Sequence, residues 1–153
     1  MIFDVEYPEE VETERLVLGA MLTDENGAAL ILDALGPDDF HLSKHKLIFE
    51  SAAAVREKGS GVDRVLVGMD LHNRGKLEAA DGLTYLASLD DGLPRVYCLE
   101  GYISQLRRAS ILRRAIMAAQ KLMGECAGPG ASLDAVVQAG DFLQSLVGER
   151  AER

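Results

Sequence analysis

Residues 36–49 read GPDDFHLSKHKLIF, a stretch that holds a helix breaker, an acidic turn and the start of an apolar helix. Pro37 ends whatever helix precedes it, and the two aspartates after it are turn-forming residues. Phe40 is an apolar side chain just ahead of a new helix, and Ser43 can cap that helix by accepting a hydrogen bond from a free backbone N–H. The pattern predicts two helices joined by a tight turn and contains no catalytic motif.

Residues 1–8 are expected to form a loose leader that ends at Pro8, and a first helix then extends to about Leu22. Its spacing separates an apolar face from an acidic one. The apolar set is Val11, Leu18 and Leu22, and the acidic set expected to point outward is Glu10, Glu12 and Glu14.

Four more short helices are expected before residue 92, each with its own start and stop signals. They are a second helix from a cap at Thr23 or Asp24 to Leu35, a third from about Ser43 to Lys58, a fourth from a cap at Asp63 to Gly75, and a fifth from a cap at Asp81 to Gly92-Leu93-Pro94, with Leu83, Leu86 and Ala87 facing inward. Because short helices can bury their apolar faces only against each other, residues 9–92 are predicted to form a compact globular bundle.

The pattern changes after Pro94, since residues 95–124 contain no proline and permit one helix of about 45 Å at 1.5 Å per residue. A turn with Gly and Pro follows, and Ser132 can cap a last apolar helix. Residues 95–150 are therefore predicted to form a long antiparallel helical hairpin. The whole chain is expected to be all-α.

The chain is expected to be a globular protein of the cytoplasm. With 153 residues and 48% hydrophobic content it fits one domain, and its apolar runs are far shorter than the roughly 20 residues that span a bilayer. Its acidic N-terminus is unlike a signal peptide. Cys98 and Cys126 are isolated in sequence and are expected to be reduced thiols.

The net charge of −9 argues against strong nucleic-acid binding, because Lys and Arg supply most of the non-specific affinity for phosphates. Before Phe40, Arg15 is the only cation among many acids. Residues 95–121 are basic, but such a run is usually a solvated helix face, and Tyr97 and Tyr102 are too few for a base-stacking platform. Direct DNA binding is expected to be weak or absent.

No residue pattern predicts catalysis, a cofactor or a metal. The sequence has no Gly-x-x-x-x-Gly-Lys-Ser/Thr loop for nucleotide phosphates, so ATP hydrolysis by that route is excluded. His41 and His45 have a spacing that could hold a metal, yet no third ligand accompanies them, which favours structural histidines. The aspartate pairs at 38–39 and 90–91 lie beside turn residues and are interpreted as turn chemistry.

A two-helix hairpin has no core of its own, and we expect its apolar surface to contact a second copy of the chain. Arg113 continues one stripe of the long helix, where it either pairs with an acceptor across the interface or marks a rotation of the contact face. The residues predicted for self-association are Leu99, Tyr102, Ile103, Leu106, Arg113, Leu143, Leu146 and Val147.

Several short patterns, in order, resemble the N-terminal domain of bacterial replicative DNA helicases of the DnaB type, over residues 8 to about 119. They are Glu14 with Val17-Leu18-Gly19, Leu35 with Pro37-Asp38-Asp39-Phe40, His45 with Ile48-Phe49, Val62-Asp63, Gly75-Lys76-Leu77-Glu78, Gly82 with Tyr85-Leu86, Pro94, Tyr102 and Arg113. Three places depart from the family pattern: Asp81 replaces the first of a glycine pair, Tyr97-Cys98-Leu99 replaces Ala and Asn, and Arg108-Ala109 replaces Glu-Lys. These departures bear on the details of the hairpin surface, and so on its partner, more than on the fold.

The resemblance implies a scaffold or collar domain of the primosome in DNA replication. In that family hairpins pair, six copies form a trimer of dimers on the motor ring, and the collar binds the C-terminal domain of primase. The ATP- and Mg²⁺-dependent motor domain, itself a partner, is not in this chain, so the chain alone is expected to have no enzymatic activity. The cations expected to face primase are Arg56, Lys58, Arg64 and Arg74.

An alternative from another class is a stand-alone helical interaction or regulatory module that shares the fold without a helicase role. A gene that continues past Arg153 into a glycine-rich phosphate loop decides for the helicase, and a fragment of a longer protein is the favoured reading. Sequence does not distinguish primase from a helicase loader as the partner, and it does not give the oligomeric state of the isolated chain.

Overall fold

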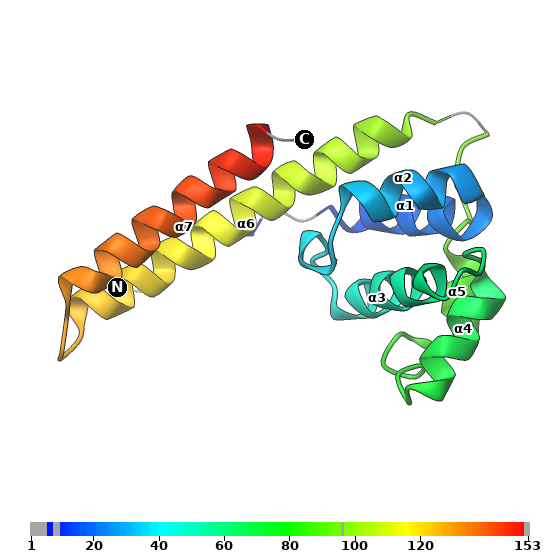
Figure 1. Cartoon of the computed structure of the whole chain (residues 1–153), viewed down its shortest axis with the longest axis horizontal. Coiled ribbons are helices and arrows are strands. Elements are labelled where there is room, and N and C mark those ends of the chain that lie inside the picture. Colours follow the sequence, from blue (N-terminus) through cyan, green and yellow to red (C-terminus); the bar gives the residue numbers. More distant parts are fainter. Residues whose placement is uncertain (1–5, 8–9, 96, 152–153) are drawn as a thin grey trace. The chain divides into compact units, whose positions relative to one another are not determined.

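A computed structural model describes residues 6–7, 10–95 and 97–151, and every regular element among them is helical (Figure 1). The elements are α1 (Val11–Thr23), α2 (Glu25–Ala34), the short 3₁₀-helix η1 (Pro37–Asp39), α3 (Ser43–Glu57), α4 (Arg64–Asn73), α5 (Gly82–Ser88), α6 (Leu99–Ala127) and α7 (Leu133–Ala151). The predicted all-α fold is confirmed.

The chain divides into two compact units, which we call the globular unit and the hairpin unit. The globular unit comprises residues 9–108, and the hairpin unit comprises residues 109–153 together with residues 1–8. Helix α6 contributes its first residues to the globular unit and the rest to the hairpin unit. Most of the predicted leader lies outside the described residues, but Tyr7 is described, and its hydroxyl donates a hydrogen bond to Gln120 Oε1 at 2.5 Å.

Three of the predicted helix caps are confirmed. Asp24, Asp63 and Ser132 each stand immediately before a helix and accept hydrogen bonds from its first free backbone N–H groups. The donors are Asn26 at 3.2 Å, Val65 and Leu66 both at 2.8 Å, and Asp134 at 3.1 Å.

Two other predicted caps are wrong. Ser43 is the first residue of α3. The capping position is occupied by Leu42, whose apolar side chain cannot accept a hydrogen bond. Asp81 stands in the capping position of α5, but its carboxylate accepts from Lys44 Nζ at 3.1 Å and not from the helix. Its backbone is left-handed, with a φ of 71°, a conformation that glycine adopts without the steric cost a side chain brings.

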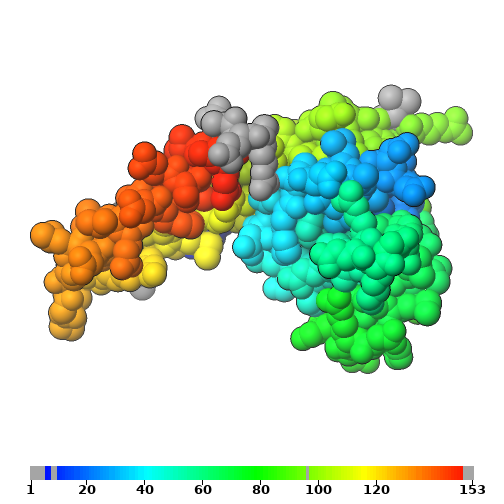
Figure 2. All heavy atoms as spheres, in the orientation of Figure 1, coloured from blue at the N-terminus to red at the C-terminus, as the bar shows by residue number. Residues whose placement is uncertain are grey.

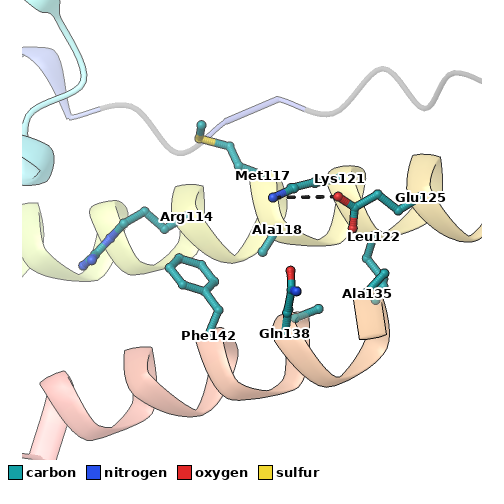
Figure 3. A pocket seen from close by; sticks show the side chains of 10 residues that line it. Arg114, Met117, Ala118, Lys121, Leu122, Glu125, Ala135, Gln138 and Phe142 are labelled. Carbon is teal, nitrogen blue, oxygen red and sulfur yellow. Dashed lines mark ion pairs between the residues drawn. The ribbon is translucent and has the colours of Figure 1, made fainter. Parts of the chain in front are cut away.

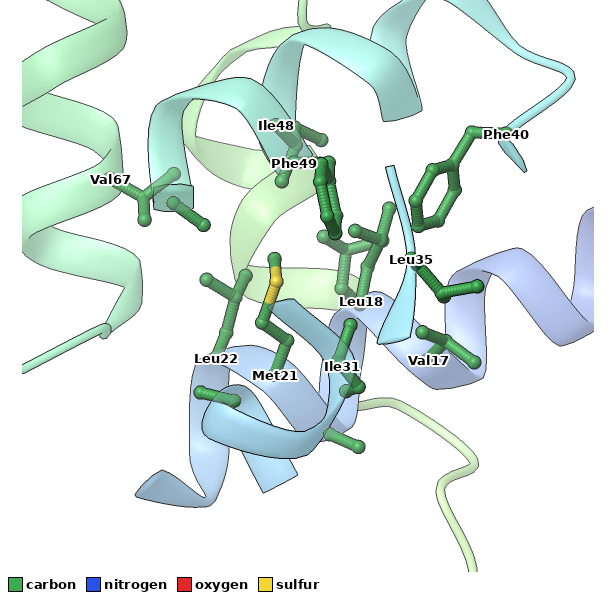
Figure 4. Packing of buried hydrophobic residues seen from close by; sticks show 14 of the residues in the cluster. Val17, Leu18, Met21, Leu22, Ile31, Leu35, Phe40, Ile48, Phe49 and Val67 are labelled. Carbon is green, nitrogen blue, oxygen red and sulfur yellow. The ribbon is translucent and has the colours of Figure 1, made fainter. Parts of the chain in front are cut away.

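The globular unit has a continuous apolar core built from α1 to α5 and the first turns of α6 (Figure 4). Phe40, which stands ahead of α3, is buried there, and its ring centre lies 5.2 Å from the ring centre of Phe49. Three residues of α5 were predicted to face inward, and of these only Leu86 belongs to the core. Leu83 is 60% exposed and Ala87 is exposed, so the prediction for these two is wrong.

Close packing in the globular unit depends on Gly19 in α1. A Cβ atom at this position would lie 2.3 Å from the backbone oxygen of Leu89, which cannot move without displacing the end of α5. Helix α1 therefore packs against this segment through a bare backbone surface. The requirement explains why an otherwise helix-weakening residue occupies the middle of α1.

The hairpin unit consists of the remainder of α6 and the antiparallel helix α7 (Figure 1). Their atoms lie directly against each other in the space-filling view, where α6 is yellow and α7 is orange to red (Figure 2). Arg114 on α6 donates to both carboxylate oxygens of Glu149 on α7, at 3.3 and 2.8 Å. The predicted antiparallel hairpin is confirmed, although α6 begins at Leu99 and continues through Gly124 to Ala127.

Candidate interaction surfaces

Glu14 lies at the centre of a buried polar cluster, and its predicted outward orientation is wrong. Its carboxylate accepts a hydrogen bond from the backbone N–H of His41 and pairs with Nδ1 of His45. The other ring nitrogen of His45 is hydrogen-bonded to the hydroxyl of Tyr85 at 2.7 Å. Glu14 and His45 are both fully buried. This chain of contacts joins α1, α3 and α5 inside the globular unit.

The Glu14 carboxylate also compensates for the missing side-chain cap of α3. It approaches the backbone N–H groups of His41 and Leu42, which lie just before the first residue of α3. The dipole of a helix favours negative charge at this N-terminal end. A carboxylate, an imidazole and a phenol in one chain are also groups used in general acid–base catalysis. Because the carboxylate and imidazole are closed off from solvent, their arrangement holds the fold and offers no place for a substrate.

Lys44 covers the outer side of this cluster. Its ammonium group lies 3.8 Å from the centre of the Tyr85 ring and pairs with Asp81 at 3.1 Å. Burial by itself lowers the pKa of Lys44, but the hydrogen bond to Asp81 and the contact with Tyr85 outweigh it, so the pKa is raised above its ordinary value. The αL residue Asp81 is thereby tied to α3.

A second polar cluster surrounds Asp70, which joins α3 to α4. Its side chain is only 6% exposed and accepts from Ser51 Oγ at 2.8 Å, while Lys58 and Arg74 approach at 3.3 and 2.9 Å. Burial raises the pKa of Asp70, but the Ser51 and Lys58 hydrogen bonds and the Arg74 charge together hold it below its ordinary value. The ionised carboxylate is therefore the form that stabilises the fold.

All four cations predicted to face a partner lie on the globular unit and pair with acids of that same unit. The pairs are Arg56 with Asp33 at 2.8 Å, Lys58 and Arg74 with Asp70, and Arg64 with Asp90 at 2.8 Å. These internal pairs reduce the positive charge that each cation presents outward.

Exposed apolar side chains of α4 and α5 form a groove of about 490 Å³ on the globular unit, which we call the α4–α5 groove. Val65, Met69 and Leu83 stand at its sides, and Gly68 and Leu86 lie at its floor. Sequence reasoning missed this feature because it assigned Leu83 to the core. The available signal was the pair Val65 and Met69, four residues apart on a helix whose buried residues, Val67 and Leu71, occupy the other face.

A second groove, of about 480 Å³, lies between α6 and α7 within the hairpin unit (Figure 3). Ala118 and Leu122 line it from α6, and Gln138 and Phe142 line it from α7. Its polar rim includes the ion pair between Lys121 and Glu125 at 3.8 Å. The hairpin unit carries further exposed apolar residues: Leu112, Met117, Met123, Leu133, Val136, Val137, Leu143 and Val147.

The eight residues predicted for self-association do not share one exposed face. Leu99, Ile103 and Leu106 belong to the core of the globular unit, and Tyr102 packs against that core with its ring 6.3 Å from Tyr97. In the hairpin unit the other four divide between buried and exposed positions. Arg113 and Leu146 are buried, and Leu143 and Val147 are exposed.

Among the described residues, no three His, Cys, Asp or Glu side chains come together in a way that could hold a metal ion. No helix in the described part of the chain is both long and apolar enough to cross a membrane. Cys98 and Cys126 are exposed and free of disulfide bonds, and His45 is the satisfied structural histidine that its sequence context indicated.

Comparison with known proteins assigns this fold to a family. Residues 6–108 match the model of the DnaB-like helicase N-terminal domain family, which is well over half of the chain. The chain belongs to this family. As a DnaB-like N-terminal domain it has 26% identity and a TM-score of 0.82 to the crystal structure of the N-terminal domain of DnaB helicase from Mycobacterium tuberculosis, covering 92% of this chain and 99% of that one.

Full-length relatives of this DnaB-like domain are replicative helicases. The Bacillus subtilis replicative DNA helicase DnaC is 33% identical over 112 residues, and the Geobacillus stearothermophilus replicative DNA helicase DnaB is 33% identical over 115 residues. These alignments cover 73% and 75% of this chain, and the chain spans about a quarter of each helicase. A solved DnaB-like replicative helicase, described with its interactions with primase, shares the fold at 22% identity and a TM-score of 0.70, over 90% of this chain and 31% of that one.

Residues that carried the sequence resemblance have definite structural tasks in this DnaB-like domain. Glu14, His45 and Tyr85 form the buried cluster, and Gly19 permits the close approach to Leu89. Asp81, where the family pattern has a glycine, takes the left-handed backbone that explains the usual residue.

Proposed function

We propose that this chain is the scaffold domain of a DnaB-type replicative helicase that acts in the cytoplasm during DNA replication. In this proposal two copies pair through their hairpin units, three such dimers form a hexameric collar, and the collar docks the C-terminal domain of primase. ATP and Mg²⁺ bind to a motor domain of the same helicase, and this chain binds DNA weakly or not at all.

The apolar surface of the hairpin unit is the observation that carries the proposal. Val137 and Val147 on α7 and Met117 on α6 are exposed, although each is the kind of side chain that a folded protein buries. An extended set of such residues marks a protein interface, and a two-fold dimer is the commonest way to cover one. Of the residues first predicted for this role, Leu143 and Val147 are the exposed members.

Self-association is tested by sedimentation of the chain at micromolar concentration, where we expect dimers or hexamers. Val147→Asp should shift the protein toward monomer, because it places a charge in the proposed apolar contact. Val65→Asp is the matched control, since Val65 is 63% exposed on the globular unit and Val147 is 69% exposed on the hairpin unit. A wild-type monomer at these concentrations, or equal effects of the two substitutions, would refute the hairpin contact.

Primase docking is proposed for the face of the globular unit that carries Arg56, Lys58, Arg64 and Arg74. Calorimetry with the C-terminal domain of the cognate primase should show binding that weakens with added salt, as expected for a charge-dependent contact. Absence of binding both by this chain and by the full-length helicase would leave the collar as a structural element only.

A further inference from the structure

The N-terminal leader contacts the hairpin unit through Tyr7. Its hydroxyl donates a hydrogen bond to Gln120 Oε1 on α6 at 2.5 Å, although the two residues are 113 positions apart in sequence. Both residues belong to the hairpin unit. The leader, expected from sequence to be loose, is therefore held to α6 at this residue.

The local sequence explains why Tyr7 can reach the helix. The ring of Pro8 keeps the residue before it out of the helical conformation, so Tyr7 favours an extended backbone. Successive side chains of an extended segment point to opposite sides. The structure agrees, since Glu6 is exposed and Tyr7 is only partly exposed. Tyr7 thus faces α6, and the acidic Glu6 faces solvent.

Gln120 marks a side of α6 that carries exposed apolar residues. Met117 and Met123 lie three positions before and after it, a spacing that places side chains next to each other on a helix. They are 58% and 49% exposed. Figure 3 shows the blue trace of residues 6–7 running beside α6, with the Met117 side chain pointing toward it. The leader therefore lies over the same side of α6 as Met117.

The strength of the contact suits a reversible role. The Tyr7–Gln120 hydrogen bond lies in an exposed setting, where the donor and the acceptor can exchange it for bonds to water. One such bond contributes little net stabilisation, and ordering the leader opposes it. A larger apolar contact over Met117 can therefore replace it.

We propose that the leader is a strap on α6, which a second copy of the chain must displace before two hairpin units pair. The inference rests on the proposed self-association through the hairpin units and adds a competing contact within each copy. Met117 belongs to the surface proposed for pairing, and the leader and a second copy cannot both occupy the side of α6 next to it. The free chain is strapped, and pairing releases Tyr7 from Gln120.

The strap is observed by fluorine NMR of the whole chain labelled with 3-fluorotyrosine, in which Tyr7→Phe identifies the Tyr7 signal. In dilute protein, Gln120→Ala should shift this signal and leave that of Tyr85 in the globular unit unchanged. As the wild-type concentration rises and dimers form, the Tyr7 signal should move toward its position in Gln120→Ala. A Tyr7 signal that ignores Gln120→Ala, or one that stays fixed while dimers form, would overturn the inference.

Competition is measured by sedimentation of the same variants. Tyr7→Phe should tighten the dimer about threefold or more, because each of two copies no longer gives up a hydrogen bond on pairing. In the Gln120→Ala background the same change should have no further effect, since the contact is already lost. Glu6→Gln is the control, because this neighbouring side chain is exposed and should leave the dimer unchanged. Weaker dimers of Tyr7→Phe would mean that the leader contacts the second copy, which contradicts the strap.

Failure of the proposed pairing has a different signature. The wild type and Tyr7→Phe would then both stay monomeric at every concentration. A Tyr7 signal that still responds to Gln120→Ala would in that case support the strap contact and contradict the pairing only. Dimers with the same dissociation constant in the wild type and in Tyr7→Phe would contradict the strap only.

Discussion

In the globular unit, the polar residues Glu14 and His45 are buried and bonded, whereas in the hairpin unit the apolar residues Val137 and Val147 are exposed. Glycines of the two units also differ in their surroundings. Gly19 of the globular unit fits a space that admits no side chain, while Gly140 of the hairpin unit has open space beside it. The difference teaches that Glu14, His45 and Gly19 are fixed by packing inside the globular unit, whereas Val137, Val147 and Gly140 are not fixed by packing inside the hairpin unit.

The largest effect is expected for Glu14→Ala. This change leaves His45 and the start of α3 without their buried hydrogen-bond partner, and each buried polar group left without a partner typically costs about 1–3 kcal/mol in the free energy of unfolding. Urea denaturation measures the loss. Glu12→Ala is the matched control two residues away, where an exposed side chain should change stability by less than about 0.5 kcal/mol. Equal losses would remove the contrast between buried and exposed acids in α1.

A pair of glycine substitutions tests the comparison directly. Gly19→Ala should lower the free energy of unfolding by about 1–3 kcal/mol, because the new methyl group would meet the Leu89 carbonyl. Gly140→Ala in α7 should instead stabilise the hairpin unit by up to about 1 kcal/mol, since alanine favours a helix and nothing blocks its side chain. Thermal denaturation of both variants gives the signs, and the same sign for both would contradict the comparison.

Asp70 should make stability depend on pH in the acidic range. Its pKa is lowered in the folded state, so the stabilisation is complete above the ordinary aspartate pKa and is lost as the pH falls through the folded value. At pH 7, Asp70→Asn should cost about 1.5–3 kcal/mol, the range for hydrogen bonds to a charged group. The difference in stability between the two proteins should begin to shrink below about pH 4 and should vanish only below the lowered pKa of the folded state. A difference that stays constant down to pH 2 would show that the charge of Asp70 is not what stabilises α3 and α4.

The smallest effect concerns the left-handed residue Asp81. Asp81→Gly and Asp81→Ala both remove the pair with Lys44, but only glycine relieves the backbone at a φ of 71°. The glycine variant should therefore be more stable than the alanine variant by about 1 kcal/mol, as measured by thermal denaturation. Equal stability would indicate that the turn before α5 adjusts its backbone to the residue present.

Local signals predicted most of the fold correctly. Asp63 and Ser132 cap helices because a short polar side chain reaches only the nearest free N–H groups, so their effect can be read from adjacent residues. Long-range contacts could not be read in this way. Glu14 follows the acidic spacing of α1, and its partner His45 is 31 residues away in sequence.

The candidate surfaces were less predictable for a related reason. Apolar spacing alone does not say what covers a helix face. Leu106 and Val147 both fitted an apolar stripe, yet the first lies in the core of the globular unit and the second is exposed. Leu83 was assigned to the core because α5 is short, and the space below it depends on Gly68 in another helix. Such assignments need the packing of the whole unit.

The buried cluster around His45 also sets the order in which the newly made protein can mature on the ribosome. Tyr85 is added 40 residues after His45, which takes about 2–8 s at 5–20 residues per second. During this interval α3 is completed behind the finished α1, but the imidazole still lacks one of its two partners and the core lacks α5. The interior of the nascent chain therefore stays incomplete until α5 has been added.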